Sequence, residues 1–285
     1  MDRKIVALYD EYARGGMNRR YFLERLAQLA GGTAAALALM PLLENNSAQA
    51  QIVAENDDRL ATTRVEYDAG GVKISGYLAR LKGGQKRPAV IVIHENRGLT
   101  PHIQDVTRRL ALEGFLAFAP DMLSPLGGTP KEEAKATQMI GTLNADETVA
   151  RLAAAVPFMA HHAESTGKVG AIGFCWGGAM ANRLAAAGTS LNASVPYYGR
   201  QLPAADVPKI TAPLLLQYGS LDQGINAGIP AYEAALKANN KPYELFMYEG
   251  ANHAFNNDTN PGRYNKEAAT LAWSRTIAFL KKYLM

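Results

Sequence analysis

The hydrophobic and polar positions from about residue 57 onward alternate between short strand-like runs and longer helix-like runs. Residues 62–67 and 72–79 alternate apolar and polar side chains around Gly70-Gly71, which predicts an antiparallel hairpin at a sheet edge. Mostly apolar runs predict further strands at 89–93, 115–119, 169–174, 193–197, 213–218 and 243–248. Helix-forming segments lie between them at 101–113, 131–139, 146–161, 179–187, 231–238 and 267–284. This order predicts an α/β fold with a mostly parallel central sheet and helices on both faces.

The first fifty residues follow a different pattern. Arg19-Arg20-Tyr21-Phe22-Leu23 precedes a mildly apolar segment, 26–43, and then the small-residue triplet Ala48-Gln49-Ala50. This order of charged, apolar and small residues is typical of an export signal, and the paired arginines resemble the bacterial twin-arginine (Tat) signal. We therefore expect residues 1–50 to be a signal or N-terminal extension and residues 51–285 to form the α/β domain.

Two alternatives apply to this N-terminal segment. It is either a signal that directs the protein to the periplasm or an amphipathic helix packed on the domain or a partner subunit, in which case the protein is cytoplasmic. Met17 is an alternative start of translation. The apolar segment is interrupted by Gln28, Gly31, Gly32 and Pro41, and an anchor needs about 20 uninterrupted apolar residues, so we expect no stable membrane anchor.

Composition limits the class of protein. The 285 residues are 48% hydrophobic and 20% charged, as expected of an ordinary globular chain, and carry a formal net charge of +4. The chain has no basic run with interleaved aromatic residues, so we expect no nucleic-acid partner. Cys175 is the only cysteine, which excludes an intramolecular disulfide, and no Cys/His spacing suggests a structural metal site.

That single cysteine lies in the stretch Gly173-Phe174-Cys175-Trp176-Gly177-Gly178, between a predicted strand and a predicted helix. A glycine-flanked turn in this context is typical of a nucleophile elbow, which exposes its central residue on a strained turn. The N–H groups at the start of the following helix favour a neighbouring anion, either a thiolate or a tetrahedral oxyanion. We expect Cys175 to be a nucleophile; the alternative is an inert, buried thiol.

Asp222 and His253 each follow a later predicted strand, so the chain order is Cys175, Asp222, His253. Because ligands of parallel sheets gather at the carboxyl ends of the strands, we expect these side chains to meet there. Nucleophile, acid and histidine in this order are typical of an α/β-hydrolase triad. His253 would accept the thiol proton, and Asp222 would orient its ring and stabilise the imidazolium.

Further motifs extend this pattern over about residues 60–285. These motifs are His94-Glu95, Ala119-Pro120-Asp121, Tyr197-Tyr198-Gly199 and Gly250-x-x-His253-x-Phe255. With them, the elbow and the Gly219-x-x-Asp222 turn, the chain resembles the dienelactone hydrolase (carboxymethylenebutenolidase) family, an α/β-hydrolase fold family. The resemblance implies that Glu95 holds the resting thiol and takes its proton, and that backbone N–H groups of Asn96 and Trp176 form the oxyanion hole.

The chain departs from the family where substrate is bound. The family holds a substrate carboxylate with two arginines, one after the Pro-Asp pair and one after the histidine, and this chain has none at either place. Two kinds of residue are candidate substrate contacts. They are arginines that replace the missing pair, and aromatic residues that either line an acyl pocket or fill the core. The candidates are Arg97, Arg200 and Arg263, with Tyr198 and Phe255 as the aromatic residues.

The sequence therefore predicts a hydrolase that acts on a small-molecule ester or lactone through a thioester on Cys175. The chemistry requires no metal or organic cofactor. A thioesterase or peptidase on the same fold is the first alternative. The second is a non-catalytic binding or redox-sensing protein that uses the single thiol.

Overall fold

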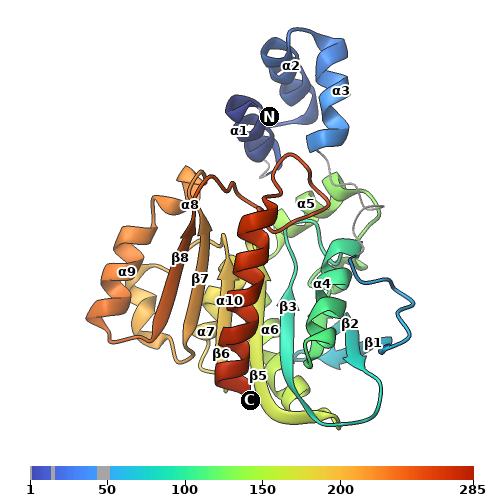
Figure 1. Ribbon diagram of the computed structural model, residues 1–285, viewed down its shortest axis with the longest axis vertical. Coiled ribbons are helices and arrows are strands. Elements are labelled where there is room, and N and C mark those ends of the chain that lie inside the picture. The colour runs from blue at the N-terminus through green and yellow to red at the C-terminus, as the bar shows by residue number, and fades with distance from the viewer. Residues whose placement is uncertain (1, 14–16, 44–51) are drawn as a thin grey trace.

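A single eight-stranded sheet organises the protein, and its strand order is β1-β2-β4-β3-β5-β6-β7-β8 (Figure 1). The computed structural model describes residues 2–13, 17–43 and 52–285. Strand β2 pairs antiparallel with β1 and β4, and the other neighbours pair in parallel, which confirms the predicted α/β fold with an N-terminal hairpin. The strands are β1 Leu60–Asp68, β2 Lys73–Leu81, β3 Arg87–Ile93, β4 Leu116–Pro120, β5 Ser165–Phe174, β6 Ala193–Tyr197, β7 Leu214–Gly219 and β8 Tyr243–Tyr248.

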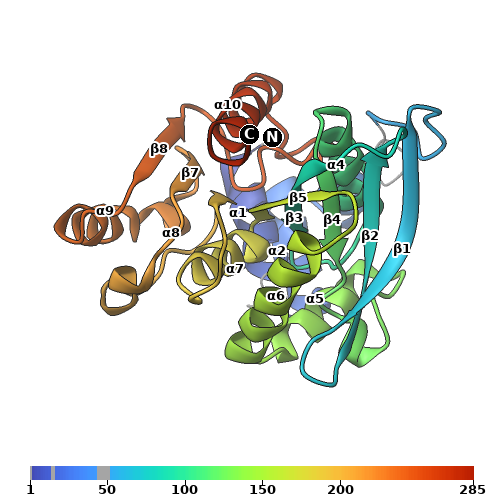
Figure 2. The ribbon, with the colours of Figure 1, turned by 90° about the horizontal axis from the view of Figure 1, so that it is seen from below.

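Helices cover both faces of this sheet and bury a hydrophobic core on each (Figure 2). Helices α4 (Pro101–Leu112) and α10 (Lys266–Leu284) pack on one face through apolar residues such as Val106 and Leu280. The other face is covered by α6 (Ala145–Ala160), α7 (Trp176–Ala185) and α9 (Ile229–Ala238). The remaining segments are α5 (Glu133–Thr142), the short α8 (Gln223–Asn226) and the 3₁₀ turns Ser124–Leu126 and Ala204–Lys209.

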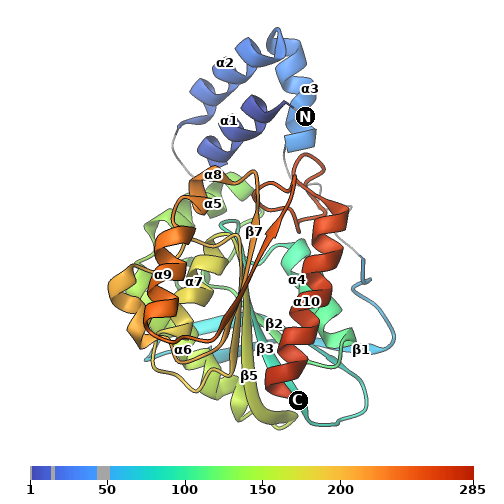
Figure 3. The ribbon, with the colours of Figure 1, turned by 60° about the vertical axis from the view of Figure 1, so that its left-hand side comes forward.

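The N-terminal residues form three helices with a core of their own. Phe22, Leu26 and Leu43 are buried among residues of the same three helices, which are α1 (Arg3–Ala13), α2 (Arg19–Ala30) and α3 (Thr33–Leu43). This segment lies over one end of the sheet, near α5 and α8 (Figure 3). No helix among the described residues is long and apolar enough to cross a membrane. The triplet Ala48-Gln49-Ala50 lies outside the described residues, and the export signal stays a prediction.

Candidate active site

Cys175 occupies a sharp turn between β5 and α7. Its φ of 55° lies in the left-handed region, which side chains other than glycine rarely adopt. The turn is so tight that a Cβ on Gly173 would collide with the carbonyl of Gly177, and one on Gly177 would collide with the carbonyl oxygens of Ile93 and His94. Glycine at both positions lets the backbone close, so that the Cys175 side chain projects from the strand end at the start of a helix.

Three side chains form one hydrogen-bonded chain at this end of the sheet. Sγ of Cys175 lies 3.0 Å from Nε2 of His253. On the other side of the ring, Nδ1 of His253 donates to Oδ2 of Asp222 at 2.5 Å. Asp222 follows β7 and His253 follows β8, so three separate strand ends supply the cluster. Both His253 and Asp222 are buried, which strengthens the interactions between them.

The histidine in this chain favours its protonated form. Burial alone would lower the pKa of His253, but the charge of Cys175 and the hydrogen bonds to Asp222 and Cys175 outweigh it. The net effect raises the pKa of His253 to about 10. An imidazolium here stabilises a thiolate on Cys175, which is the nucleophilic form of a cysteine.

Glu95 lies in the loop after β3 and is fixed by a residue from a distant part of the chain. Its Oε2 accepts a 2.8 Å hydrogen bond from Nδ2 of Asn257, and both side chains are buried. Oδ1 of Asn257 accepts from the N–H and the hydroxyl of Thr259, so the amide is oriented with its nitrogen toward Glu95. Asn257 lies in the segment after His253 where the family has an arginine, and nothing in the local sequence pattern indicates its contact with Glu95.

His94 braces the loop that carries Glu95 and Asn96. Nε2 of His94 accepts from the N–H of Met122 at 3.1 Å, so Nδ1 carries the proton and donates to the carbonyl of Glu95 at 2.7 Å. Burial lowers the pKa of His94, which keeps it neutral. Its ring also stacks on Trp176 at 5.3 Å between centroids. These contacts join the Glu95-Asn96 loop to the first residue of α7.

The two aromatic residues that the sequence predicts as substrate contacts, Tyr198 and Phe255, pack near His253. Tyr198 and Phe255 are fully buried, and their ring centroids are 5.4 Å apart. The ring of Tyr198 is 5.1 Å from that of His253. Burial and the charges of Glu95 and Cys175 raise the pKa of Tyr198, which keeps the phenol neutral. Packing of this kind holds the His253 ring in place, and a contact with substrate stays a prediction for both aromatic residues.

The three candidate arginines have different surroundings. Arg200 is exposed, whereas Arg97 and Arg263 are buried. Arg97 pairs with Glu133 at 3.0 Å and donates to the hydroxyl of Tyr9 at 2.8 Å. The guanidinium of Arg263 lies 5.0 Å from the centre of the same Tyr9 ring. The structure thus brings two of the three together around one residue of the N-terminal segment.

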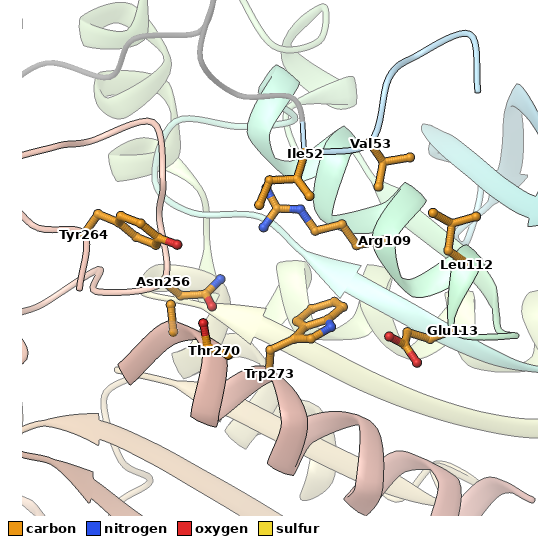
Figure 4. A pocket seen from close by; sticks show the side chains of 10 residues that line it. Ile52, Val53, Arg109, Leu112, Glu113, Asn256, Tyr264, Thr270 and Trp273 are labelled. Atoms are coloured by element: carbon orange, nitrogen blue, oxygen red, sulfur yellow. The ribbon is translucent and has the colours of Figure 1, made fainter. Parts of the chain in front are cut away.

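A cavity of about 300 Å³ lies between α4 and α10 and is bordered by Asn256 of the loop after β8 (Figure 4). Trp273 from α10 and Leu112 from α4 face each other across it (Figure 4). Its lining includes none of Cys175, Asp222, His253 and Glu95. The lining residues are Ile52, Val53, Arg109, Leu112, Glu113, Asn256, Tyr264, Ala269, Thr270 and Trp273.

Comparison with known proteins assigns this arrangement to a family. The model of the dienelactone hydrolase family matches residues 74–284, which include the elbow and all three strand-end side chains. The chain belongs to the dienelactone hydrolase family. Its sheet, helix order and elbow are therefore those of an α/β-hydrolase fold.

Relatives and solved structures agree with this membership. The "Putative carboxymethylenebutenolidase" of Saccharolobus solfataricus is 33% identical over 253 residues, which cover 76% of this chain and 96% of the relative. The crystal structure of a "Putative Dienelactone Hydrolase" from Klebsiella pneumoniae has a TM-score of 0.71 and 28% identity, with coverage of 79% and 99%. A dienelactone hydrolase-like promiscuous phosphotriesterase from metagenomic libraries has a TM-score of 0.72 and 26% identity, with coverage of 80% and 100%.

Because it belongs to the dienelactone hydrolase family, the chain is a hydrolase of carboxylic esters or lactones. The coverage values also distinguish the hydrolase part of the chain from the N-terminal segment. About four fifths of this chain match the whole length of both solved structures. The hydrolase fold therefore forms in relatives from that part alone.

Proposed function

We propose that the protein hydrolyses a small-molecule carboxylic ester or lactone by nucleophilic attack of Cys175, with His253 and Asp222 as its catalytic partners. The observation that carries this proposal is the unbroken chain of contacts from Sγ of Cys175 through His253 to Asp222. A nucleophile, a base within hydrogen-bond reach and a carboxylate that orients the base are the parts this chemistry needs. No step requires a metal or organic cofactor.

The reaction proceeds in two halves. Sγ of Cys175 attacks the carbonyl carbon while His253 holds the thiol proton, and the oxyanion accepts hydrogen bonds from the backbone N–H groups of Asn96 and Trp176. When the tetrahedral intermediate collapses, the C–O bond breaks, His253 protonates the leaving alkoxide and a thioester remains. A water molecule then gives a proton to His253 and attacks the thioester. Collapse of the second intermediate breaks the C–S bond, releases the acid and leaves the Cys175 thiolate beside protonated His253.

Glu95 has the proposed role of a second acceptor for the Cys175 proton. It is buried in the loop after β3, and its Oε2 accepts a hydrogen bond from Asn257. Its Oε1 has no hydrogen-bond partner among the residues that the structure describes. A buried carboxylate oxygen without a donor is costly, so it favours a nearby proton source such as the thiol in its resting position.

The test is hydrolysis by the wild type, Cys175→Ala and Cys175→Ser across four substrate classes: lactones, p-nitrophenyl esters, acyl thioesters and peptides. We expect esters or lactones to be cleaved by the wild type, with activity lost in Cys175→Ala. Equal rates in all three proteins would refute the mechanism. A preference for thioesters or peptides would identify the alternative hydrolase class, and alkylation of Cys175 without any Cys175-dependent hydrolysis would identify a non-catalytic thiol protein.

We also propose that residues 1–50 direct export to the periplasm. A Tat-type signal is recognised on an already folded chain, so its arginines must be accessible. Arg19 and Arg20 are both exposed at the start of α2, which supports this proposal. Intact-mass measurement of protein from a bacterial periplasmic fraction tests it. Loss of the first fifty residues is expected, and a full-length protein confined to the cytoplasm would contradict it.

A further inference from the structure

The Tyr9 side chain is held between two arginines of the hydrolase domain. It is 3% exposed, and its hydroxyl accepts a 2.8 Å hydrogen bond from Nη2 of Arg97. The guanidinium carbons of Arg97 and Arg263 lie 5.9 Å and 5.0 Å from the centre of its ring. Two cations and a hydrogen bond thus meet on one phenol, which is the geometry of cation–π recognition.

These two arginines adjoin the catalytic cluster. Arg97 follows Glu95 by two residues in the loop after β3, and it is close enough for the Glu95 charge to act on it. Arg263 lies in the segment between His253 and α10 and acts electrostatically on Tyr198, which also senses Cys175. The two arginines therefore lie on the same two chain segments as Glu95 and His253, and both contact Tyr9 of the N-terminal segment.

The N-terminal segment is an attachment to the domain rather than part of its core. The core of α1, α2 and α3 consists of residues from 5 to 43, whereas both cores of the sheet consist of residues from 53 onward. Besides Tyr9, Leu43 contacts the hydrolase domain, because its carbonyl accepts a 2.9 Å hydrogen bond from Nδ2 of Asn260. Together with the family match to residues 74–284, this separation leads us to expect that residues 52–285 fold on their own, as do the solved relatives that are matched over almost their whole length.

We propose that Arg97 and Arg263 form an aryl-binding clamp at the mouth of the active site, which Tyr9 occupies as an internal stand-in for an oxygenated aromatic ring of the substrate. This inference rests on the proposed function, and it names the substrate class as esters or lactones that carry a phenol-like ring. Withdrawal or removal of the N-terminal segment would vacate the clamp.

The charges around the clamp favour a neutral ring over a carboxylate. Glu133 pairs with Arg97 at 3.0 Å and offsets part of its charge. A phenol presents its ring to both guanidinium groups and an oxygen acceptor to Arg97, so it reproduces the contacts that Tyr9 makes with the two arginines. A saturated ring of the same size keeps the acceptor and loses the π face, which provides a matched comparison.

The first experiment measures binding of p-cresol, the side chain of tyrosine, and of 4-methylcyclohexanol as its saturated analogue. Residues 52–285 carrying Cys175→Ala are titrated with each compound and followed by NMR. We expect p-cresol to bind at least about 5-fold more tightly, as two partly buried cation–π contacts imply. The full chain should bind p-cresol more weakly than residues 52–285 because Tyr9 competes, and Tyr9→Ala in the full chain should restore binding. Equal affinities for the two compounds would overturn the proposal.

Substitutions of the two arginines test whether they form the clamp. Arg97→Gln and Arg263→Gln should each remove most of the preference for p-cresol. Arg200→Gln is the matched control, because it removes the same charge from an exposed arginine near the strand ends. If Arg200→Gln reduced the preference as much as the other two, the effect would be one of net charge and the clamp would be refuted.

A kinetic comparison connects the clamp to turnover. Residues 52–285 with Cys175 intact are assayed on p-nitrophenyl 3-(4-hydroxyphenyl)propionate and on its 3-cyclohexylpropionate counterpart, which share a leaving group. We expect a kcat/KM ratio that favours the phenolic ester and falls in Arg97→Gln and Arg263→Gln. If neither ester were hydrolysed, the result would count against the proposed function, and p-cresol binding would still test the clamp. If both esters were hydrolysed and the kcat/KM ratio did not change in the arginine variants, only the assignment of the substrate class would be overturned.

Discussion

Nδ2 of Asn257 donates a 2.8 Å hydrogen bond to Oε2 of Glu95, which joins the loop after β8 to the loop after β3. The two residues are 162 positions apart in the chain, and both are buried. Asn257 also lies four residues after His253, so one short loop carries His253 and fixes Glu95. The position of Glu95 therefore depends on the loop that presents the histidine.

Asn257→Ala should lower kcat for a p-nitrophenyl ester about 10-fold, since a buried hydrogen bond to a charged group contributes about 1.5–3 kcal/mol. The physical reason is the loss of the hydrogen bond that Nδ2 of Asn257 donates to Oε2 of Glu95. In a double-mutant cycle with Glu95→Gln, the effect of Asn257→Ala should largely disappear.

Asn256→Ala is the matched control for that experiment. Asn256 is the neighbouring buried amide, and its Nδ2 has no hydrogen-bond partner among the described residues. Its loss should leave kcat within about 2-fold, because no contact to Glu95 is removed. Equal losses of kcat in the two variants would show that the loop, rather than the Glu95 contact, controls the rate.

The titration of His253 should have a midpoint at about pH 10. Cys175→Ala removes the largest contribution that raises this pKa, and Asp222→Asn removes the next contact, so both variants should shift the midpoint downward. NMR of ¹⁵N-labelled histidine measures all three. An unchanged midpoint in both variants would contradict the pairing of the three side chains.

The same pKa predicts a dependence of stability on pH. The protonated form of His253 contributes stability that is fully present below its ordinary value of 6.5 and is lost as the pH rises through about 10. Urea unfolding between pH 6 and pH 10.5 should show a smaller decline for Asp222→Asn than for the wild type. A parallel decline in the two proteins would exclude the contribution of His253.

Local pattern predicted the fold and much of the cluster, but not the contacts that join distant loops. The alternation of strand and helix patterns fixes where each strand ends, and Cys175, Asp222 and His253 lie at three such ends. Their meeting follows from parallel topology alone. The Asn257 contact to Glu95 joins two irregular loops, and the Tyr9 contact to Arg97 joins helix α1 to the loop after β3. No local sequence pattern in either loop indicates which distant residue it contacts.

Asp258 anchors the loop after β8 to α4, and its removal should destabilise the protein. Its Oδ2 accepts a 2.5 Å hydrogen bond from Nη2 of Arg109, and its Oδ1 lies 2.9 Å from Nδ1 of His102. Burial raises the pKa of Asp258, but these two partners lower it further, below its ordinary value of 3.8. Stability from this group is therefore present above pH 3.8 and is lost as the pH falls below that value.

Asp258→Asn should thus reduce the unfolding free energy by about 1–3 kcal/mol at pH 7 and by less at pH 3. Urea unfolding at the two pH values measures the difference. Asp146→Asn is the control, because Asp146 pairs with Arg183 while 92% exposed, and such pairs contribute little. A constant effect of Asp258→Asn at both pH values would contradict the ionic anchor.

The elbow makes the sharpest steric prediction. A methyl group on Gly177 would meet the carbonyl oxygens of Ile93 and His94, which are main-chain atoms held in β3 and its loop and have no rotamer to change. Gly177→Ala should therefore cost about 2–3 kcal/mol of unfolding free energy and displace Cys175 from His253.

Gly141→Ala in α5 is the control, since its methyl group meets nothing within 4 Å and alanine favours a helix by up to about 1 kcal/mol. Thermal unfolding with alkylation of Cys175 measures both effects. If Gly177→Ala had wild-type stability, the loop after β3 would have to move to accommodate the methyl group. The tight closure of the elbow would then not determine the position of Cys175.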